Sequence, residues 1–310
     1  MIAAYAPATV SNVACGFDVL GFAMDEPGDV VVAEPQEGPG VSIAAIEGDG
    51  GRLPLDPLRN TAGAAALALL SRLETTRGVR LTLHKGIPLA SGVGSSGASA
   101  VAAVVATNEL LGRPASLDVL LECAMKGEQV GCGAAHPDNA SPALYGGFVL
   151  ARSAQPPDII RLPVPAGLAC AVLHPRVEVK TGESRQLLGE MVALKDAVRQ
   201  WGNLGGLVAA LYTGDLGLLS RSLVDVIAEP KRAGLVPGFF EVKAAALAAG
   251  ALGCSLSGSG PSIFALAASL DVAQRAGEAM ARAFDSASAV GADLWVSPVG
   301  RQGARIISHR

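Results

Sequence analysis

Short runs of apolar and β-branched residues in the first part of the chain are typical of β-strands. They predict strands at residues 30–34 and 41–46, separated by a turn rich in Pro and Gly, and at residues 79–84, where apolar and polar residues alternate. Asn60 precedes a run of Ala and Leu. We therefore expect Asn60 to cap a helix that continues to about Thr75.

Helical patterns dominate the next part of the chain. Residues 86–96 have the composition of a Gly/Ser loop that opens a helix to about Leu111. Ser116 is a suitable cap for a further helix that ends near Gln129. Residues 131–147 are rich in Gly, Pro and Asn, and are expected to form a long loop before a strand at 148–151.

The second half of the chain mixes strands and helices. Two prolines within residues 153–157 indicate a linker. Because no internal repeat is present and the elements are mixed, we predict an α+β fold in two domains, residues 1–160 and 161–310. The later elements expected are a strand at 168–173, several helices between Thr181 and Ala249, a second Gly/Ser loop at 250–262, a helix at 271–284 and a strand at 293–297.

The composition narrows the functional classes. The 310 residues carry a formal net charge of −4 without a block of Lys and Arg, which argues against a nucleic-acid partner. No apolar stretch approaches the roughly 20 residues of a membrane span, and the N-terminus lacks the basic region of a signal peptide. Five widely spaced cysteines without a C-x-x-C pair are typical of reduced thiols. We therefore expect a cytoplasmic protein without a membrane partner.

A loop of glycines and serines between a predicted strand and a predicted helix carries the strongest chemical signal. Glycines allow positive φ and the close approach of a ligand, and the first N–H groups of the helix carry partial positive charge. Such a site suits the phosphates of a nucleotide, with serine hydroxyls available to an oxygen or to Mg²⁺. The loop comprises Pro88, Leu89, Ala90, Ser91, Gly92, Val93, Gly94, Ser95, Ser96, Gly97 and Ala98.

Other interpretations of this loop remain open. The simplest is a flexible turn with a serine cap. The P-loop pattern G-x-x-x-x-G-K-[ST] is absent, because Gly-Lys-Ser/Thr does not occur in the chain. Gly92, Gly94 and Gly97 match the dinucleotide pattern G-x-G-x-x-G, but the acidic residue expected about 20 positions later is missing.

Three motifs, in order along the chain, resemble those of the GHMP kinase superfamily. The central motif, P-x-x-x-G-L-G-S-S-A, is similar to residues 88–97, with Val93 in place of Leu and Gly97 in place of Ala. Residues 6–21 resemble the first motif, and residues 253–262 resemble the third. The resemblance implies an N-terminal domain like domain 2 of ribosomal protein S5, a C-terminal ferredoxin-like domain, and commonly a homodimer.

Residues 133–147, 181–185 and 229–239 are similar to the homoserine kinase branch of this superfamily. The resemblance implies that ATP, bound at the loop, phosphorylates the side-chain hydroxyl of L-homoserine to O-phospho-L-homoserine in threonine biosynthesis. It also implies that Ser96 and Glu128 hold Mg²⁺, a cation that prefers hard oxygen ligands. The alternative for Glu128 is an exposed side chain at a helix end.

The same resemblance implies the residues that bind the amino-acid substrate. The planar guanidinium groups of two arginines suit its carboxylate, an aspartate suits its ammonium group, and Asn139 would orient its hydroxyl. The simpler alternatives are a helix cap for Thr181 and a solvated side chain for Arg185. The implied set is Asn12, Asp18, His136, Asn139, Thr181, Arg185 and Arg232.

A general base is not evident from the sequence. The Asp–Lys pair of some GHMP kinases is not recognisable, and Asp138 is a candidate without a fixed direction. Our hypothesis at this stage is direct attack by the hydroxyl, aligned by Asn139, so that Asp138→Asn retains much of kcat.

Two further functional classes remain open. One is another GHMP kinase that acts on a different alcohol, of the mevalonate or shikimate type. The other is a dinucleotide-dependent oxidoreductase, or a nucleotide-binding module without catalysis. The paired arginines favour a substrate that carries an amino-acid carboxylate.

Overall fold

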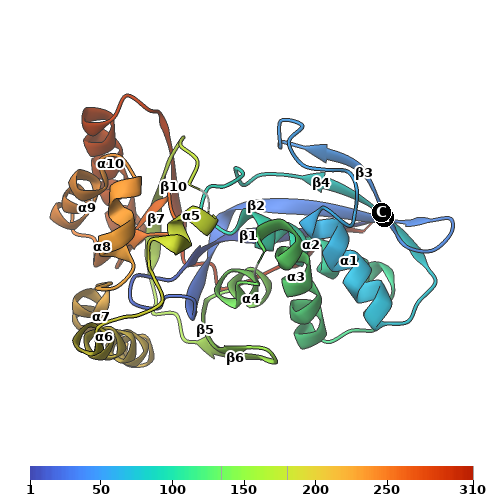
Figure 1. Cartoon of the computed structure of the whole chain (residues 1–310), viewed down its shortest axis with the longest axis horizontal. Helices are drawn as coiled ribbons and strands as arrows, with labels where there is room; N and C mark the ends of the chain where they lie inside the picture. The colour runs from blue at the N-terminus through green and yellow to red at the C-terminus, as the bar shows by residue number, and fades with distance from the viewer. Residues whose placement is uncertain (134, 180, 310) are drawn as a thin grey trace.

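The computed structural model describes residues 1–133, 135–179 and 181–309 (Figure 1). Among these residues, the first of two β-sheets contains seven strands. Five strands follow the order β11-β1-β2-β4-β3, while β5 pairs with β2 and β6 pairs with β5. Neighbours are antiparallel apart from β3 and β4, which run parallel. The strands are β1 (Ile2–Ser11), β2 (Leu20–Gln36), β3 (Val41–Glu47), β4 (Gly78–His84), β5 (Phe148–Ala154), β6 (Pro157–Leu162) and β11 (Arg305–His309).

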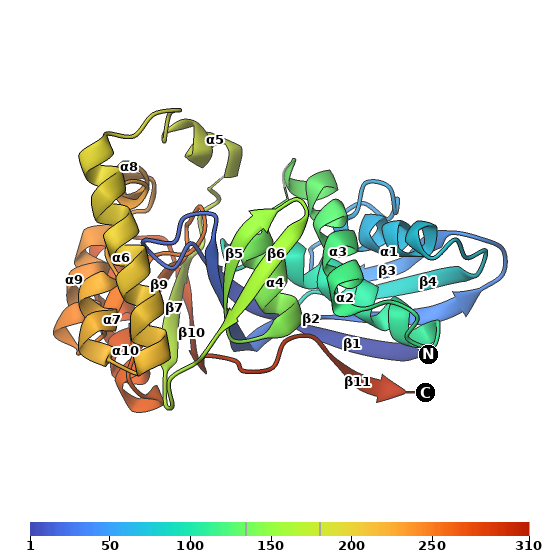
Figure 2. The same ribbon diagram turned by 90° about the horizontal axis from the view of Figure 1, so that it is seen from below.

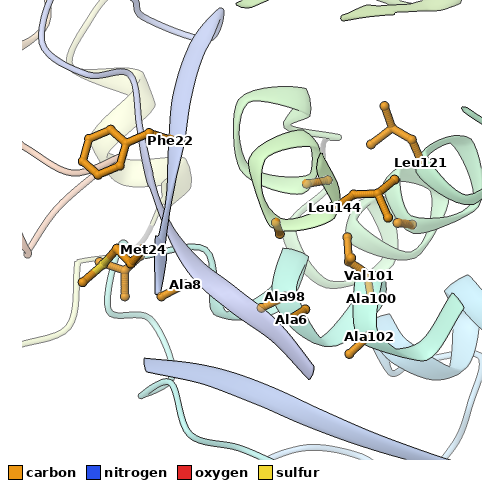
Figure 3. Close-up of a cluster of buried hydrophobic side chains, with 14 of the residues drawn as sticks. Ala6, Ala8, Phe22, Met24, Ala98, Ala100, Val101, Ala102, Leu121 and Leu144 are labelled. Carbon is orange, nitrogen blue, oxygen red and sulfur yellow. The ribbon is translucent and has the colours of Figure 1, made fainter. Parts of the chain in front are cut away.

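Helices cover one face of this sheet, as Figure 2 shows. The central helix α2 contacts β1 and β2 and is flanked by α1 and α3. Its small side chains, including the fully buried Ala98 and Ala102, let it approach the strands closely. Leu121 and Leu144 on neighbouring helices belong to the same buried cluster (Figure 3). Because α2 is apolar on nearly every side, it is stable only inside this layer. The helices are α1 (Thr61–Arg72), α2 (Ser95–Leu110), α3 (Leu117–Cys132) and α4 (Pro137–Tyr145).

The second sheet is antiparallel, with the order β10-β7-β9-β8, and α9 and α10 pack against it. Within the described residues no helix is long and apolar enough to cross a bilayer. The strands are β7 (Ala169–Pro175), β8 (Gly253–Leu256), β9 (Ile263–Ala267) and β10 (Ala292–Pro298). The helices are α5 (Thr181–Gln186), α6 (Leu194–Thr213), α7 (Leu216–Ser222), α8 (Glu229–Arg232), the 3₁₀ turn η1 (Ala233–Leu235), α9 (Phe239–Ala248) and α10 (Leu270–Ala287).

One hydrophobic cluster contains buried side chains of both sheets, and smaller clusters lie at the second sheet and its helices. The ring of Phe22 on β2 lies 4.9 Å from the ring of Phe148 and 6.1 Å from that of Phe264 on β9, measured between centroids. After β10 the chain returns to the first sheet, where β11 pairs with β1. The proposed limits of 1–160 and 161–310 stay a prediction, and residue 160 lies inside β6.

Several elements confirm the sequence-based expectations. The side chain of Asn60 accepts hydrogen bonds from the N–H groups of Ala62 (3.0 Å) and Gly63 (3.4 Å), and Ser116 caps α3. The expected strands at 79–84 and 293–297 and the helix at 271–284 correspond to β4, β10 and α10. The fold is α+β, as predicted.

Three expectations were wrong. Residues 250–262 are not one loop, because they contain strand β8, which pairs with β9. Residues 131–147 are not one loop, because they contain α4. The helix tolerates Pro137 because this residue stands in the first turn, where a backbone N–H would have no partner within the helix. The internal Pro142 removes one helical hydrogen bond without ending the helix. Residues 153–157 are not a linker, since they join β5 and β6 in a hairpin.

The shared core makes a prediction about stability. Phe264→Ala should lower the free energy of unfolding by about 3–5 kcal/mol, because it removes a fully buried ring between the sheets. Urea unfolding followed by fluorescence and circular dichroism measures this loss. Phe240→Ala is the control, because this ring is 65% exposed and its removal should change stability by less than about 0.5 kcal/mol. Two separate transitions in the Phe264 variant would contradict a shared core.

Candidate active site

A cavity of about 690 Å³ opens between the two sheets, within the range of about 300–1,000 Å³ usual for small-molecule sites. It brings together most of the expected site residues, namely Asn12, Asp18, Leu89, Ala90, Ser91, Gly92, Gly94, Ser95, Ser96, Glu128, His136, Asp138, Asn139, Arg185 and Arg232. Four residues of the glycine-serine loop do not line it, which are Pro88, Val93, Gly97 and Ala98. The side chain of Thr181 lies outside the described residues.

The glycine-serine loop ends at the N-terminus of α2. Gly94 is the N-cap with φ of 72°, and no side chain caps the first N–H groups of the helix. A Cβ atom at Gly94 would lie 2.2 Å from Oγ1 of Thr9, so this position requires glycine. The exposed N–H groups and the helix dipole make this end of the cavity attractive to anions.

The two serines at the start of α2 differ in direction. The hydroxyl of Ser95 donates to the carbonyl of Ile87 (3.1 Å), so it supports the loop from inside. The hydroxyl of Ser96 donates to Oε1 of Glu128 (3.2 Å), which brings together the two residues expected to hold a metal.

Glu128 is buried, with 2% of its surface exposed, so the alternative of an exposed helix-end residue is wrong. Its second oxygen, Oε2, has no hydrogen-bond partner among the described residues, and burial raises the pKa of Glu128 to about 8. A buried carboxylate oxygen without a partner is unfavourable unless it binds a proton or a cation. Ser96 and Glu128 therefore fit a site for a hard cation.

Asp138 is a second buried carboxylate at the cavity. Its Oδ2 accepts a hydrogen bond from the backbone N–H of Asn12 (3.3 Å), while Oδ1 has no partner among the described residues. Burial, and to a lesser extent the nearby Asp18, raises the pKa of Asp138 to about 7. The neighbouring Asn139 accepts a weak hydrogen bond from Thr9 (3.4 Å) through its amide oxygen, which leaves the amide nitrogen to bind a substrate oxygen.

A group of charged side chains also lines the cavity. Arg185 forms an ion pair with Asp18. Arg232 is 4% exposed and donates to the carbonyls of Ser184 (3.2 Å) and Gly258 (3.3 Å), and burial lowers the pKa of Arg232. The arrangement offers two guanidinium groups and one carboxylate, which complements a zwitterion.

Asn12 fixes the position of the carboxylate in this group. Its Oδ1 accepts from the backbone N–H of Asp18 (2.9 Å), and its Nδ2 donates to the carbonyl of Gly258 (2.9 Å). Asn12, Val13 and Ala14 all have positive φ, at 68°, 41° and 57°, and Asp18 has 59°. Such strained backbone is most often retained at functional sites.

The sequence analysis missed a buried ion pair behind the glycine-serine loop. Lys85 pairs with Asp29 and donates to the carbonyl of Ser95 (3.0 Å). Asp29 also accepts from the N–H groups of Gly86 (3.0 Å) and Ile87 (3.1 Å). Burial lowers the pKa of Lys85 against the raising effect of Asp29. The signal available was Asp29 itself, a charge directly before three valines.

A second wall of the cavity was also missed. It comes from the chain between β3 and α1 and combines apolar side chains with two arginines. No motif marks this stretch in the sequence. Its residues at the cavity are Arg52, Leu53, Pro54, Leu58, Arg59 and Asn60.

The buried ion pair generates a prediction. Asp29→Asn should lower the free energy of unfolding by about 3–5 kcal/mol, because it leaves the Lys85 ammonium group buried without a countercharge. The double variant Asp29→Asn/Lys85→Met removes the stranded charge and should recover part of this loss in urea unfolding. If the loss in unfolding free energy of the double variant equals the sum of the losses of the two single variants, the result would argue against the ion pair.

Comparison with known proteins places this geometry in a family. The family model for the GHMP kinases N terminal domain matches residues 60–147, and the model for GHMP kinases C terminal matches residues 207–286. The homoserine kinase of Chlorobium phaeovibrioides is 54% identical, with 98% of each chain covered. That of Chlorobaculum tepidum is 51% identical, with 99% of this chain and 98% of the relative covered.

Solved structures agree with these relatives. A crystal structure of homoserine kinase from Cytophaga hutchinsonii matches with a TM-score of 0.96 and 53% identity, covering 99% of this chain and 97% of that one. Mevalonate kinase from L. major, at 19% identity and a TM-score of 0.72, shares the fold alone. The chain has the two-domain GHMP kinase fold and belongs to the homoserine kinase family.

Proposed function

We propose that this protein transfers the γ-phosphoryl group of ATP to the side-chain hydroxyl of L-homoserine, giving O-phospho-L-homoserine for threonine biosynthesis. The observation that carries the proposal is one cavity lined both by an uncapped helix N-terminus and by Asp18, Arg185 and Arg232. The helix N-terminus suits polyphosphate, and the charged group suits an amino-acid zwitterion. The relatives that cover nearly the whole chain are named homoserine kinases.

The charged end would orient the substrate. Arg185 and Arg232 bind its carboxylate, and Asp18 binds its ammonium group. His136 and Thr181 are proposed to complete this site, as expected from the sequence. With both charged groups fixed, the side-chain hydroxyl extends toward Asn139 and the N-terminus of α2.

Mg²⁺ is proposed to accompany ATP. Ser96 and Glu128 would hold it, because they supply a hydroxyl and a buried carboxylate oxygen that no described residue pairs with. When bound, the cation neutralises charge on the phosphate oxygens. The loop at residues 88–98 would contribute backbone N–H groups to the same phosphates.

Asp138 is proposed as the proton acceptor. Its buried Oδ1, which has no partner within the described ranges, and its raised pKa of about 7 suit a general base. The hydroxyl oxygen forms a bond to the γ-phosphorus, its proton passes to Asp138, and the bond to the β–γ bridging oxygen breaks as ADP leaves. This assignment replaces the hypothesis of unassisted attack.

The alternatives are less well supported. Mevalonate would present a carboxylate but no ammonium group to Asp18. An oxidoreductase is disfavoured because the chain belongs to a kinase family. The homodimer and the cytoplasmic location stay predictions.

The direct test is ADP release with L-homoserine, compared with L-serine, L-threonine and mevalonate. L-homoserine should have the highest kcat/KM, because it carries both charged groups, which mevalonate does not, and its primary hydroxyl lies one carbon farther from them than the hydroxyl of L-serine. Equal or better turnover of mevalonate would overturn the proposal.

A change at Asp138 tests the proton acceptor. Asp138→Asn keeps the side-chain shape but removes the base, so kcat should fall by roughly 10²- to 10⁴-fold. The measurement is steady-state ADP release at saturating substrates, with the unfolding midpoint as a check on structure. A kcat within about tenfold of the wild type would instead support the hypothesis of direct attack without a general base.

Arg232 tests the carboxylate site. Arg232→Ala should raise the KM for L-homoserine roughly 10- to 100-fold, because a charge-assisted hydrogen bond is lost, while ATP binding stays nearly unchanged. Titration of each substrate at a fixed level of the other separates the two constants. Equal effects on both ligands would contradict the assigned role.

A further inference from the structure

The aromatic ring of Phe17 lies against both arginines of the proposed carboxylate site. Its centroid is 5.1 Å from Cζ of Arg232 and 5.6 Å from Cζ of Arg185, within the distance of about 6 Å at which cation–π attraction is significant. One half-buried ring therefore contacts two like charges that repel each other. Phe17 has no role in the proposed function as described so far.

Phe17 stands on a rigid turn. The N–H of Gly16 donates to the carbonyl of Asn12 (2.8 Å), and the N–H of Leu20 donates back to the carbonyl of Gly16 (2.8 Å). A Cβ atom at Gly16 would lie 2.2 Å from Cβ of Leu20, so the turn closes tightly only with glycine. The ring is therefore held in place by the same loop that positions Asp18.

The two arginines depend on the ring to different degrees. Arg232 is buried and anchored by two backbone carbonyls. The side chain of Arg185 is 48% exposed, and its polar partner among the described residues is Asp18. Arg185 therefore has the weaker support and the greater need of the ring.

Binding of a zwitterion changes the pairing of these charges. Asp18 pairs with Arg185 in the structure, but the proposed function assigns Asp18 to the substrate's ammonium group. The ring face attracts Arg185 independently of Asp18, because the attraction arises from the quadrupole of the ring.

We propose that Phe17 is a positioning residue of the carboxylate site, which holds Arg185 beside Arg232 when Asp18 turns to the substrate's ammonium group. This inference rests on the proposed function. Packing alone does not explain an aromatic residue at this point of the first motif, because the ring is not fully buried.

Phe17→Leu is the test, because it keeps an apolar side chain but removes the ring face. The KM for L-homoserine should rise roughly 3- to 30-fold, while kcat and the KM for ATP stay nearly unchanged. Phe17→Tyr and Phe17→Trp keep a ring face and should restore the wild-type KM. An unchanged KM in Phe17→Leu, or no rescue by either aromatic variant, would overturn the inference.

Binding of two fragments of the substrate, measured by calorimetry, distinguishes a role of Phe17 in the carboxylate site from a general loss of structure. 4-Hydroxybutanoate has the carboxylate without the ammonium group, and 3-aminopropan-1-ol has the reverse. Phe17→Leu should weaken binding of the first by a smaller factor than it weakens binding of L-homoserine, because Asp18 still supports Arg185 when the ligand has no ammonium group, and it should leave binding of the second unchanged. Equal weakening of both would indicate a general structural role and contradict the proposal.

A matched control is available at Tyr5, whose ring lies 4.4 Å from Cζ of Arg305 and does not line the cavity. Tyr5→Leu removes a cation–π contact elsewhere and should leave both fragment affinities unchanged. The calorimetric experiment needs no turnover. If the wild type fails to phosphorylate L-homoserine, the proposed function falls while the fragments still decide the role of Phe17.

Discussion

The rest of the site depends on the hydrogen bonds that the carbonyl group of Gly258 accepts. This carbonyl group accepts hydrogen bonds from Nδ2 of Asn12 (2.9 Å) and from Nη1 of Arg232 (3.3 Å). The adjacent Ser257 donates to the carbonyl of Gly92 in the glycine-serine loop (2.7 Å). A short loop of the second sheet thus fixes both the phosphate end and the zwitterion end of the cavity. The separation of the two ends, which phosphoryl transfer requires, is set by this loop rather than by either sheet alone.

The buried charges divide into two kinds. Asp29 and Lys85 satisfy each other and the surrounding N–H and carbonyl groups, so they hold the loop in place. Glu128 and Asp138 each keep one buried oxygen that has no partner in the described part of the chain, although burial makes such an atom unfavourable. Among these carboxylates, an incomplete set of hydrogen bonds therefore separates Glu128 and Asp138, which have proposed chemical roles, from the structural Asp29.

Local signals in the sequence were sufficient for part of the fold. Asn60 and Ser116 act as caps through side-chain contacts two or three residues away, so their role can be predicted from composition. The pairing of Asp29 with Lys85 could not, because the two residues are 56 positions apart and meet only through the packing of the sheet and α2. Helix α4 was missed because its prolines suggest a loop until the position of Pro137 in the first turn is known. The site residues came from resemblance, and the sequence alone could not orient Asp138 or show that Glu128 is buried.

Selectivity for a zwitterion follows from the charges around Asp18. In the absence of substrate, Arg185 and Asp18 neutralise each other, and Arg232 is the remaining cation of the group. A ligand with a carboxylate but no ammonium group competes with Asp18 for Arg185 and leaves that aspartate without a countercharge. A zwitterion replaces one ion pair by two, so Asp18 keeps a countercharge in a partly desolvated site while the two arginines share one carboxylate. Discrimination against simple hydroxy acids therefore comes from the aspartate, while the arginines supply most of the attraction.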